Sequence, residues 1–163
     1  MKEKIAISNT SPLLYLYRIG LIHLLGELFE AVWVPDAVKR ELEIGRQEGY
    51  DVPSLEALNW IRCVNPEAMP SEWLALDLGP GELAAMALAL EYPEYIVLLD
   101  DLLARRTAEA AGLKVWGTLR VILTAKRRGL VARVEPYVDR LAEAGMWLSP
   151  EIRVRILRLA GEI

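Results

Sequence analysis

Oxygen-bearing side chains stand where several predicted elements of this sequence begin or end. Asn9 and Asp100 each close an apolar strand, and Glu82 begins a helix after a Gly-Pro-Gly turn. Glu41 lies one helical turn beyond Val38. Hard divalent cations such as Mg²⁺ take oxygen ligands and keep several waters, and such an ion can orient water for in-line attack on a phosphodiester. These four positions therefore indicate a metal-dependent hydrolase site.

The same residue types also have purely structural uses, so the spacing alone leaves two interpretations open. Glu82 at a helix N-terminus complements the helix dipole without any catalytic purpose. Asp100 and Asp101 are suited to cap the helix that follows them. Glu41 stands in a charged stretch and fits an ordinary exposed position.

Composition excludes most other chemistry. The 163 residues include one Cys and one His, so no intrachain disulfide or Cys/His zinc site can form. His23 is predicted to be a partly exposed helix residue and Cys63 a core residue. The run Gly79-Pro80-Gly81 lacks the Lys and Ser/Thr of a phosphate-binding loop, and no Gly-x-Gly-x-x-Gly follows a strand. Carboxylates are therefore the expected reagents.

Charge is distributed unevenly along the chain. Residues 1–104 include 7 basic and 17 acidic residues, which gives a net charge of −10. Residues 105–163 include 12 basic and 6 acidic residues, which gives a net charge of +6. An acidic site beside an Arg-rich surface suits a metal-dependent enzyme that acts on a polyanion. Solvated helix faces explain the same distribution equally well.

Strands and helices are predicted to alternate. Apolar or β-branched runs predict strands at residues 4–8, 31–34, 60–64, 96–99 and 114–116. Helices are predicted between and after them, near residues 10–17, 21–29, 36–44, 82–91, 102–111, 118–128, 135–144 and 150–160, and residues 46–53 are predicted to form a mobile loop. This alternation indicates a parallel α/β sheet with helices on both faces, in which ligands bind beyond the carboxyl ends of the strands.

Nothing in the sequence predicts export or membrane insertion. No run of about 18 uncharged apolar residues occurs, and the first residues lack the pattern of a signal peptide. We expect one domain over residues 1–163, located in the cytoplasm.

Short motifs follow one another in an order and spacing typical of one protein group. They are Asn9-Thr10-Ser11-Pro12-Leu13, Val34-Pro35, Val38-Lys39-Arg40-Glu41-Leu42, Leu78-Gly79-Pro80-Gly81-Glu82, Leu98-Leu99-Asp100-Asp101, Arg105-Arg106 and Gly117-Thr118-Leu119. Over nearly its whole length the chain resembles PIN-domain-like proteins related to the VapC toxins of prokaryotic toxin–antitoxin pairs.

The resemblance implies a three-layer α/β/α PIN-like fold with a central parallel sheet of about five strands. It also implies a Mg²⁺- or Mn²⁺-dependent ribonuclease that acts on RNA, forms a homodimer and is inhibited by a small antitoxin protein. The family's acidic positions fall on Asn9, Glu41, Glu82 and Asp100, with Asp101 as an auxiliary acid. Ser11 and Thr118 match the supporting hydroxyl positions, and Arg105 and Arg106 are candidate contacts to RNA phosphates.

Asn9 departs from the family pattern, because active PIN nucleases carry Asp at this position. An amide oxygen can ligate a metal ion but brings no negative charge. Two hypotheses therefore remain: a metal-dependent endoribonuclease that acts as a toxin, and a non-catalytic module that binds RNA or a partner through a weakened metal site.

Overall fold

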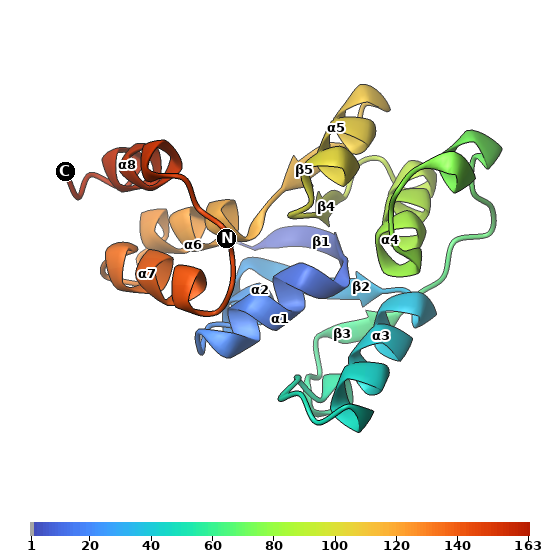
Figure 1. Cartoon of the computed structure of the whole chain (residues 1–163), viewed down its shortest axis with the longest axis horizontal. Coiled ribbons are helices and arrows are strands. Elements are labelled where there is room, and N and C mark those ends of the chain that lie inside the picture. The colour runs from blue at the N-terminus through green and yellow to red at the C-terminus, as the bar shows by residue number, and fades with distance from the viewer. Residues whose placement is uncertain (1) are drawn as a thin grey trace.

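Five parallel strands form one sheet in the computed structural model, which describes residues 2–163 (Figure 1). Their order across the sheet is β3-β2-β1-β4-β5. The strands are β1 (Glu3–Ser8), β2 (Phe29–Val34), β3 (Ile61–Cys63), β4 (Ile96–Leu98) and β5 (Lys114–Trp116). Because β1 pairs with β2 on one side and β4 on the other, the chain changes direction across the sheet at the β1–β4 pair.

Helices cover both faces of the sheet, and each face has its own core. The helices are α1 (Thr10–Arg18), α2 (His23–Leu28), α3 (Asp36–Gln47), α4 (Pro80–Glu91), α5 (Leu102–Ala110), α6 (Thr118–Arg127), α7 (Glu135–Glu143) and α8 (Pro150–Leu159). Ala6 and Leu98 pack in one core with α1, α2 and α6, whereas Ile7 and Val97 pack in the other with α4 and α5. This alternation buries both sides of β1 and β4, as a parallel sheet requires. The predicted three-layer α/β/α architecture is confirmed.

The structure differs from the predicted elements in a few places. Phe29, predicted to end a helix, begins β2 because it is fully buried and lies opposite Glu3 of β1. Two 3₁₀ helices, η1 (Leu55–Ala57) and η2 (Ser71–Ala75), occupy segments for which no element was predicted. Single turns of this kind have too little periodicity to be recognised in a sequence.

The prediction that Cys63 lies in the core is wrong. Cys63 ends β3, an edge strand, and its side chain is exposed. Its Sγ donates a hydrogen bond of 2.8 Å to Asp36 Oδ1. An apolar run on an edge strand has one uncovered side, which the sequence pattern did not reveal. His23 is exposed at the start of α2.

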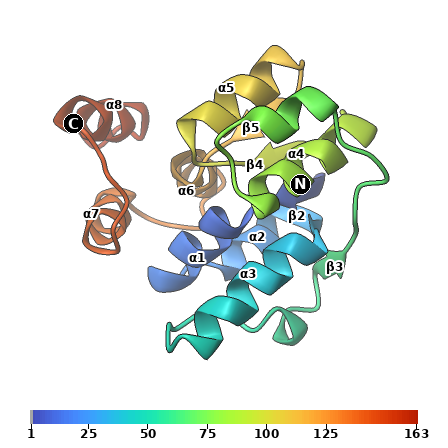
Figure 2. The ribbon, with the colours of Figure 1, turned by 45° about the vertical axis from the view of Figure 1, so that its right-hand side comes forward.

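The C-terminal helices α7 and α8 lie to one side of the sheet, beyond α6 (Figures 1 and 2). Glu162, just after α8, fixes the end of the chain to α6 and α7. Its carboxylate accepts hydrogen bonds from the backbone N–H groups of Val134 and Glu135 and from Lys126 Nζ. Within residues 2–163, no helix has the length and apolar character needed to cross a membrane.

The sheet places Asn9 and Asp100 side by side. Ser8 lies opposite Leu98 in the β1–β4 pair, and the Asn9 N–H donates to the Leu98 carbonyl at 3.3 Å. Both residues therefore leave the sheet at the same edge, where open α/β sheets bind their ligands.

Candidate active site

Asn9 carries a buried polar atom with no partner. Its side chain is 3% exposed, and its Oδ1 makes no hydrogen bond within residues 2–163. The residue's backbone is satisfied, because the Asn9 N–H bonds Leu98 and the Asn9 carbonyl accepts from Ser8 Oγ at 2.9 Å. An unsatisfied buried acceptor costs about 1–3 kcal/mol, so native proteins rarely keep one without a bound water, ion or ligand.

Glu41 joins three elements at the same edge of the sheet. The Thr10 hydroxyl, at the start of α1, donates to Glu41 Oε1. The backbone N–H of Gly81, in the first turn of α4, donates to Glu41 Oε2 at 3.1 Å. Since Glu41 itself lies on α3, its carboxylate fixes α3 against the N-termini of α1 and α4.

Glu82 lies in the first turn of α4, half-buried, and faces other acids. Its Oε1 accepts a hydrogen bond of 3.0 Å from the Gly79 N–H, which caps the helix. Burial raises the pKa of Glu82, and the negative charges of Asp101, Glu41 and Asp77 raise it further, while the Gly79 hydrogen bond opposes these effects. The structure thus brings Glu82 near Glu41 and Asp101.

Asp100 is held by the N-terminus of α6. The Thr118 N–H donates to Asp100 Oδ1 at 2.8 Å, and the Thr118 hydroxyl donates to Oδ2 at 2.7 Å. Burial raises the pKa of the Asp100 carboxyl, although these hydrogen bonds and the positive charge of Arg105 act in the opposite direction. Thr118 therefore supports this carboxylate directly.

Asp101 caps the next helix, as its structural interpretation predicted. Its Oδ2 accepts a hydrogen bond of 2.9 Å from the Ala104 N–H at the start of α5. The residue is exposed, and its charge acts on Glu82. Asp101 therefore combines a capping role with a position beside the acidic residues.

Thr10 contacts the site in a way that the sequence pattern did not predict. Ser11 was matched to a supporting hydroxyl position, yet its side chain forms no hydrogen bond within the part of the chain that the structure describes, whereas Thr10 contacts Glu41. In the sequence, Thr10 is notable only as part of the motif that begins at Asn9. Its position directly after Asn9 was the available signal, but which of the two hydroxyls faces α3 depends on the rotation of α1.

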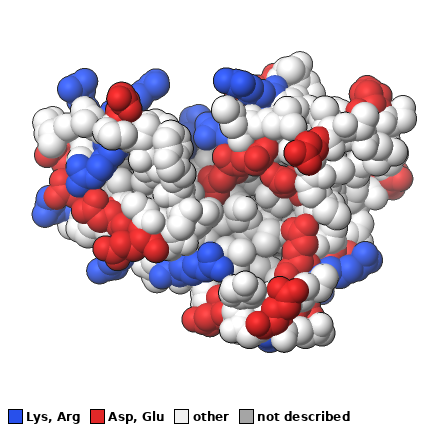
Figure 3. All heavy atoms as spheres, viewed as in Figure 1, with Lys and Arg blue, Asp and Glu red and all other residues white. Residues whose placement is uncertain are grey.

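The candidate residues lie near the carboxyl ends of β1 and β4, but they are not arranged as a complete metal-binding site. Acidic side chains gather over the ends of the central strands and the beginnings of α3 and α4, with basic side chains beside them over α5 (Figure 3). Within residues 2–163, no three Asp, Glu, His or Cys side chains are grouped closely enough to hold a metal ion. Glu41 and Asp100 each direct both carboxylate oxygens toward N–H or hydroxyl donors on neighbouring elements.

Comparison with known proteins decides the family. A family model described as a PIN domain, DUF3368, matches residues 5–162. The chain belongs to this PIN-domain family. In fold, this PIN domain is similar to a PilT N-terminus domain protein from the hyperthermophilic archaeon Sulfolobus solfataricus P2, with a TM-score of 0.52 and 12% sequence identity, over 76% of this chain and 93% of that protein. No curated protein matches the sequence significantly.

Family membership indicates a general function for the acidic face, the surface that carries Glu41, Glu82, Asp100 and Asp101. PIN domains are commonly nucleases, and they generally use divalent metal ions. The unpaired Asn9 Oδ1 and the carboxylates of Glu41, Glu82 and Asp100 supply oxygen ligands, the class of ligand that Mg²⁺ and Mn²⁺ take. The donor chemistry of this PIN domain therefore fits such an ion.

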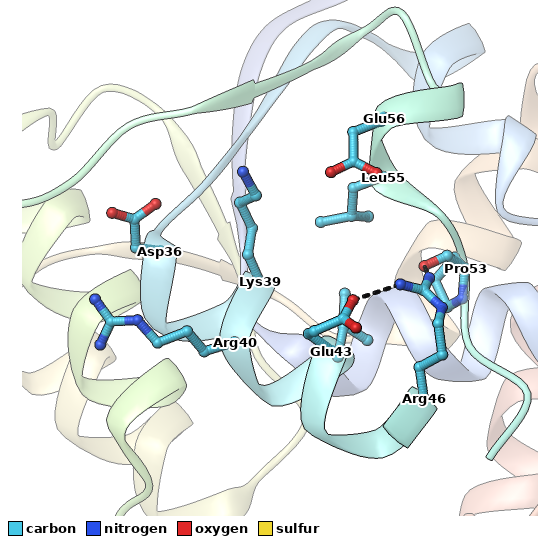
Figure 4. A pocket seen from close by; sticks show the side chains of 9 residues that line it. Asp36, Lys39, Arg40, Glu43, Arg46, Pro53, Leu55 and Glu56 are labelled. Carbon is cyan, nitrogen blue, oxygen red and sulfur yellow. Dashed lines mark hydrogen bonds and ion pairs between the residues drawn. The ribbon is translucent and has the colours of Figure 1, made fainter. Parts of the chain in front are cut away.

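A separate hollow of about 290 Å³ on this PIN domain lies between α3 and η1 (Figure 4). Lys39 and Glu56 line it, and the Glu43–Arg46 ion pair of 2.6 Å crosses one side. Acidic and basic residues alternate around it, and Asn9, Glu41, Glu82 and Asp100 do not contribute. A hollow with this mixture of charges has no preference for a polyanion. The acidic face therefore remains the candidate site.

Proposed function

We propose that this PIN domain is a Mg²⁺- or Mn²⁺-dependent endoribonuclease and the toxin component of a toxin–antitoxin pair. One observation carries the metal-dependent part of the proposal: within residues 2–163, Asn9 Oδ1 is buried without a partner where β1 ends, beside the end of β4 that leads to Asp100. A cation would satisfy this oxygen and reduce the repulsion between neighbouring carboxylates.

The residues proposed to hold the ion are Asn9, Glu41, Glu82, Asp100 and Asp101, and the carboxylates among them would move closer together around the ion than they lie in this structure. When bound, a divalent cation supplies a polarised water and neutralises charge that develops on a phosphodiester. Thr10 and the Gly81 N–H orient Glu41, and Thr118 orients Asp100. Catalytic roles belong in this proposal to Glu41, Glu82, Asp100 and Asn9, because these residues would hold the ion on which the reaction depends.

Arg105 and Arg106 of α5 are proposed to bind the RNA backbone. Arg105 is half-buried beside Asp100, and Arg106 is exposed with no ion pair or hydrogen bond in the described chain. Arginine is suited to phosphate because its guanidinium presents several donors in a fixed plane. The two side chains would thus place RNA against the acidic face.

The test is an RNA cleavage assay on the purified protein. Single-stranded RNA and a structured tRNA are incubated with Mn²⁺, Mg²⁺ or EDTA, using the native chain, Glu82→Gln and Asp100→Asn. Glu109→Gln is the matched control, because Glu109 is an exposed residue of α5 whose side chain forms no hydrogen bond or ion pair within residues 2–163. We expect metal-dependent cleavage by the native chain and the control, and at least about a hundredfold loss in the two acid variants.

The neutral Asn9 favours one alternative, a non-catalytic module that binds RNA or a protein partner. Each missing negative charge near a divalent ion removes several kcal/mol of attraction at about 4 Å and intermediate dielectric. If the native chain binds RNA but never cleaves it, while Asn9→Asp gains cleavage, the binding module is the correct function.

The toxin role, the antitoxin partner, the homodimer and the cytoplasmic location form the remaining part of the proposal. They are supported by the order of motifs that the chain shares with VapC-related proteins. Expression of the chain alone should arrest growth of a bacterial host. Co-expression of a short neighbouring reading frame should relieve the arrest, whereas failure of both effects would remove the toxin role without affecting the nuclease proposal.

A further inference from the structure

We propose that Gly81 and Gly117 are positioning residues whose missing side chains seat the carboxylates of Glu41 and Asp100. The inference rests on the proposed function, in which these carboxylates bind a cation. Both glycines lie in first turns or caps that border the acidic face, one at α4 and one at α6.

A side chain at Gly81 would collide with the Glu41 carboxylate and would force it to move. A Cβ at this position would overlap Glu41 Oε1 and would lie 2.9 Å from Glu41 Cδ and 3.0 Å from Oε2. The Gly81 N–H bonds the same carboxylate at 3.1 Å. The Gly81 backbone thus donates a hydrogen bond to the Glu41 carboxylate and also packs directly against it.

The backbone does not require glycine here. Gly81 lies inside α4 and has no positive φ, so any residue could adopt its conformation. Alanine is the better helix former, and helix propensity alone would favour it. The close approach of Glu41 is therefore the physical reason for glycine at this position.

Gly117 shows the same arrangement in a milder form. Its φ of −98° and ψ of 175° are extended values that any residue adopts. A Cβ here would lie 3.1 Å from Arg105 Nη1 and 3.2 Å from Asp100 Oδ1, which is tight without overlap. An added methyl group would displace this pair by a few tenths of an ångström.

Two other glycines provide internal comparisons. A Cβ at Gly79 would lie 3.6 Å from Glu82 Oε1 and 3.8 Å from Glu41 Oε2, ordinary van der Waals distances. Gly45 lies in α3, the helix that carries Glu41, and its Cβ would meet only Val52 at 3.5 Å. A Cβ at these four positions would thus range from overlap with a site carboxylate, at Gly81, to no contact with the site, at Gly45.

The series predicts an order of metal affinities. Gly81→Ala should displace the Glu41 carboxylate and weaken Mn²⁺ binding at least about tenfold, as loss of supporting contacts around metal ligands does. Gly117→Ala should weaken binding by a smaller factor. Gly45→Ala, the control, should bind as the native chain does.

The experiment is calorimetric titration of Mn²⁺ into the whole chain and each variant, with thermal unfolding in EDTA to compare stability. The double variant Gly81→Ala/Glu41→Asp separates positioning from general damage, because the shorter acid withdraws its carboxylate from the added methyl. With Glu41→Asp as the reference for the double variant, we expect Gly81→Ala to weaken Mn²⁺ binding by a smaller factor in the Glu41→Asp background than in the native chain.

The outcomes separate the two proposals. Absence of Mn²⁺ binding by the native chain would reject the metal site and, with it, the seating role. Native binding together with unchanged affinity in Gly81→Ala would overturn the seating role and leave the metal site intact. An equal loss of affinity on Gly81→Ala in the native and Glu41→Asp backgrounds would also overturn it, because the loss would then come from damage to α4.

Discussion

The hydroxyl of Thr10 donates a hydrogen bond to Glu41 Oε1 across 31 positions of sequence. This contact joins α1, which begins directly after the orphaned Asn9, to the middle of α3. With the Gly81 amide on the other carboxylate oxygen, it holds Glu41 in one place before any ligand arrives. The candidate site is thus organised by hydrogen bonds between helix N-termini and carboxylates.

Removing the Thr10 hydroxyl should loosen this arrangement. Thr10→Val keeps the shape of the side chain but leaves Glu41 Oε1 without its donor, so we expect a loss of about 1–3 kcal/mol in the free energy of unfolding. Chemical denaturation in EDTA measures it. Thr10→Ser keeps a hydroxyl and is the matched control; equal losses in both variants would show that the methyl group, and not the hydrogen bond, matters.

Asn9→Asp should have opposite effects with and without metal. In EDTA the new carboxylate adds a buried negative charge near Glu82 and Asp100, so the melting temperature should fall. In millimolar Mn²⁺ the added charge strengthens binding and should raise the melting temperature above that of the native chain. A fall under both conditions would argue against a cation beside residue 9.

Glu162 should make the stability depend on pH. Burial alone would raise the pKa of this carboxyl, but hydrogen bonds from Val134, Lys126 and Glu135 outweigh it and lower the pKa below its ordinary value of 4.5. A carboxyl with a lowered pKa in the folded state stabilises the fold above its unfolded pKa, and the contribution disappears as the pH falls through the folded value.

Glu162→Gln therefore should be less stable than the native chain at pH 7, and the difference should shrink progressively below about pH 4.5. Denaturant midpoints at a series of pH values measure this. Glu143→Gln, at an exposed end of α7, is the control. A difference that stays constant with pH would assign the role of Glu162 to shape instead of charge.

Arg106 should contribute to RNA affinity through charge alone. Arg106→Gln should weaken RNA binding and reduce the slope of log affinity against log salt concentration by about 1. Filter binding at several salt concentrations in EDTA separates this effect from cleavage. Lys114→Gln is the control, since Lys114 is the first residue of β5 and lies at the amino ends of the strands, opposite the carboxyl ends where the candidate site lies. An equal effect in both variants would indicate nonspecific attraction.

Much of the fold followed from local sequence patterns. The apolar runs around Ile7 and Val97 predicted buried parallel strands, and the strand-end rule then predicted that Asn9 and Asp100 would meet. The exposure of the Cys63 side chain could not be predicted in this way, because an edge strand and a central strand share the same short apolar pattern. The two 3₁₀ turns were missed for lack of periodicity.

The details of the site depended on tertiary geometry. Which hydroxyl of Thr10 and Ser11 would reach Glu41 depends on how α1 is rotated, and the sequence does not encode that rotation locally. Gly81 belongs to the Gly-Pro-Gly turn that is visible in the sequence, but the group that approaches it is a side chain from 40 positions earlier. Contacts of this kind become visible only after α3 and α4 have packed.

The central claim, that a divalent cation binds where β1 and β4 end, is tested most directly by anomalous diffraction from crystals soaked in Mn²⁺. We predict an anomalous peak within about 2.3 Å of Asn9 Oδ1 and of at least one carboxylate among Glu41, Glu82 and Asp100. The peak should be absent from crystals of Asp100→Asn soaked in the same way. A native crystal with a water on Asn9 Oδ1 and no anomalous peak at this edge of the sheet would contradict the account.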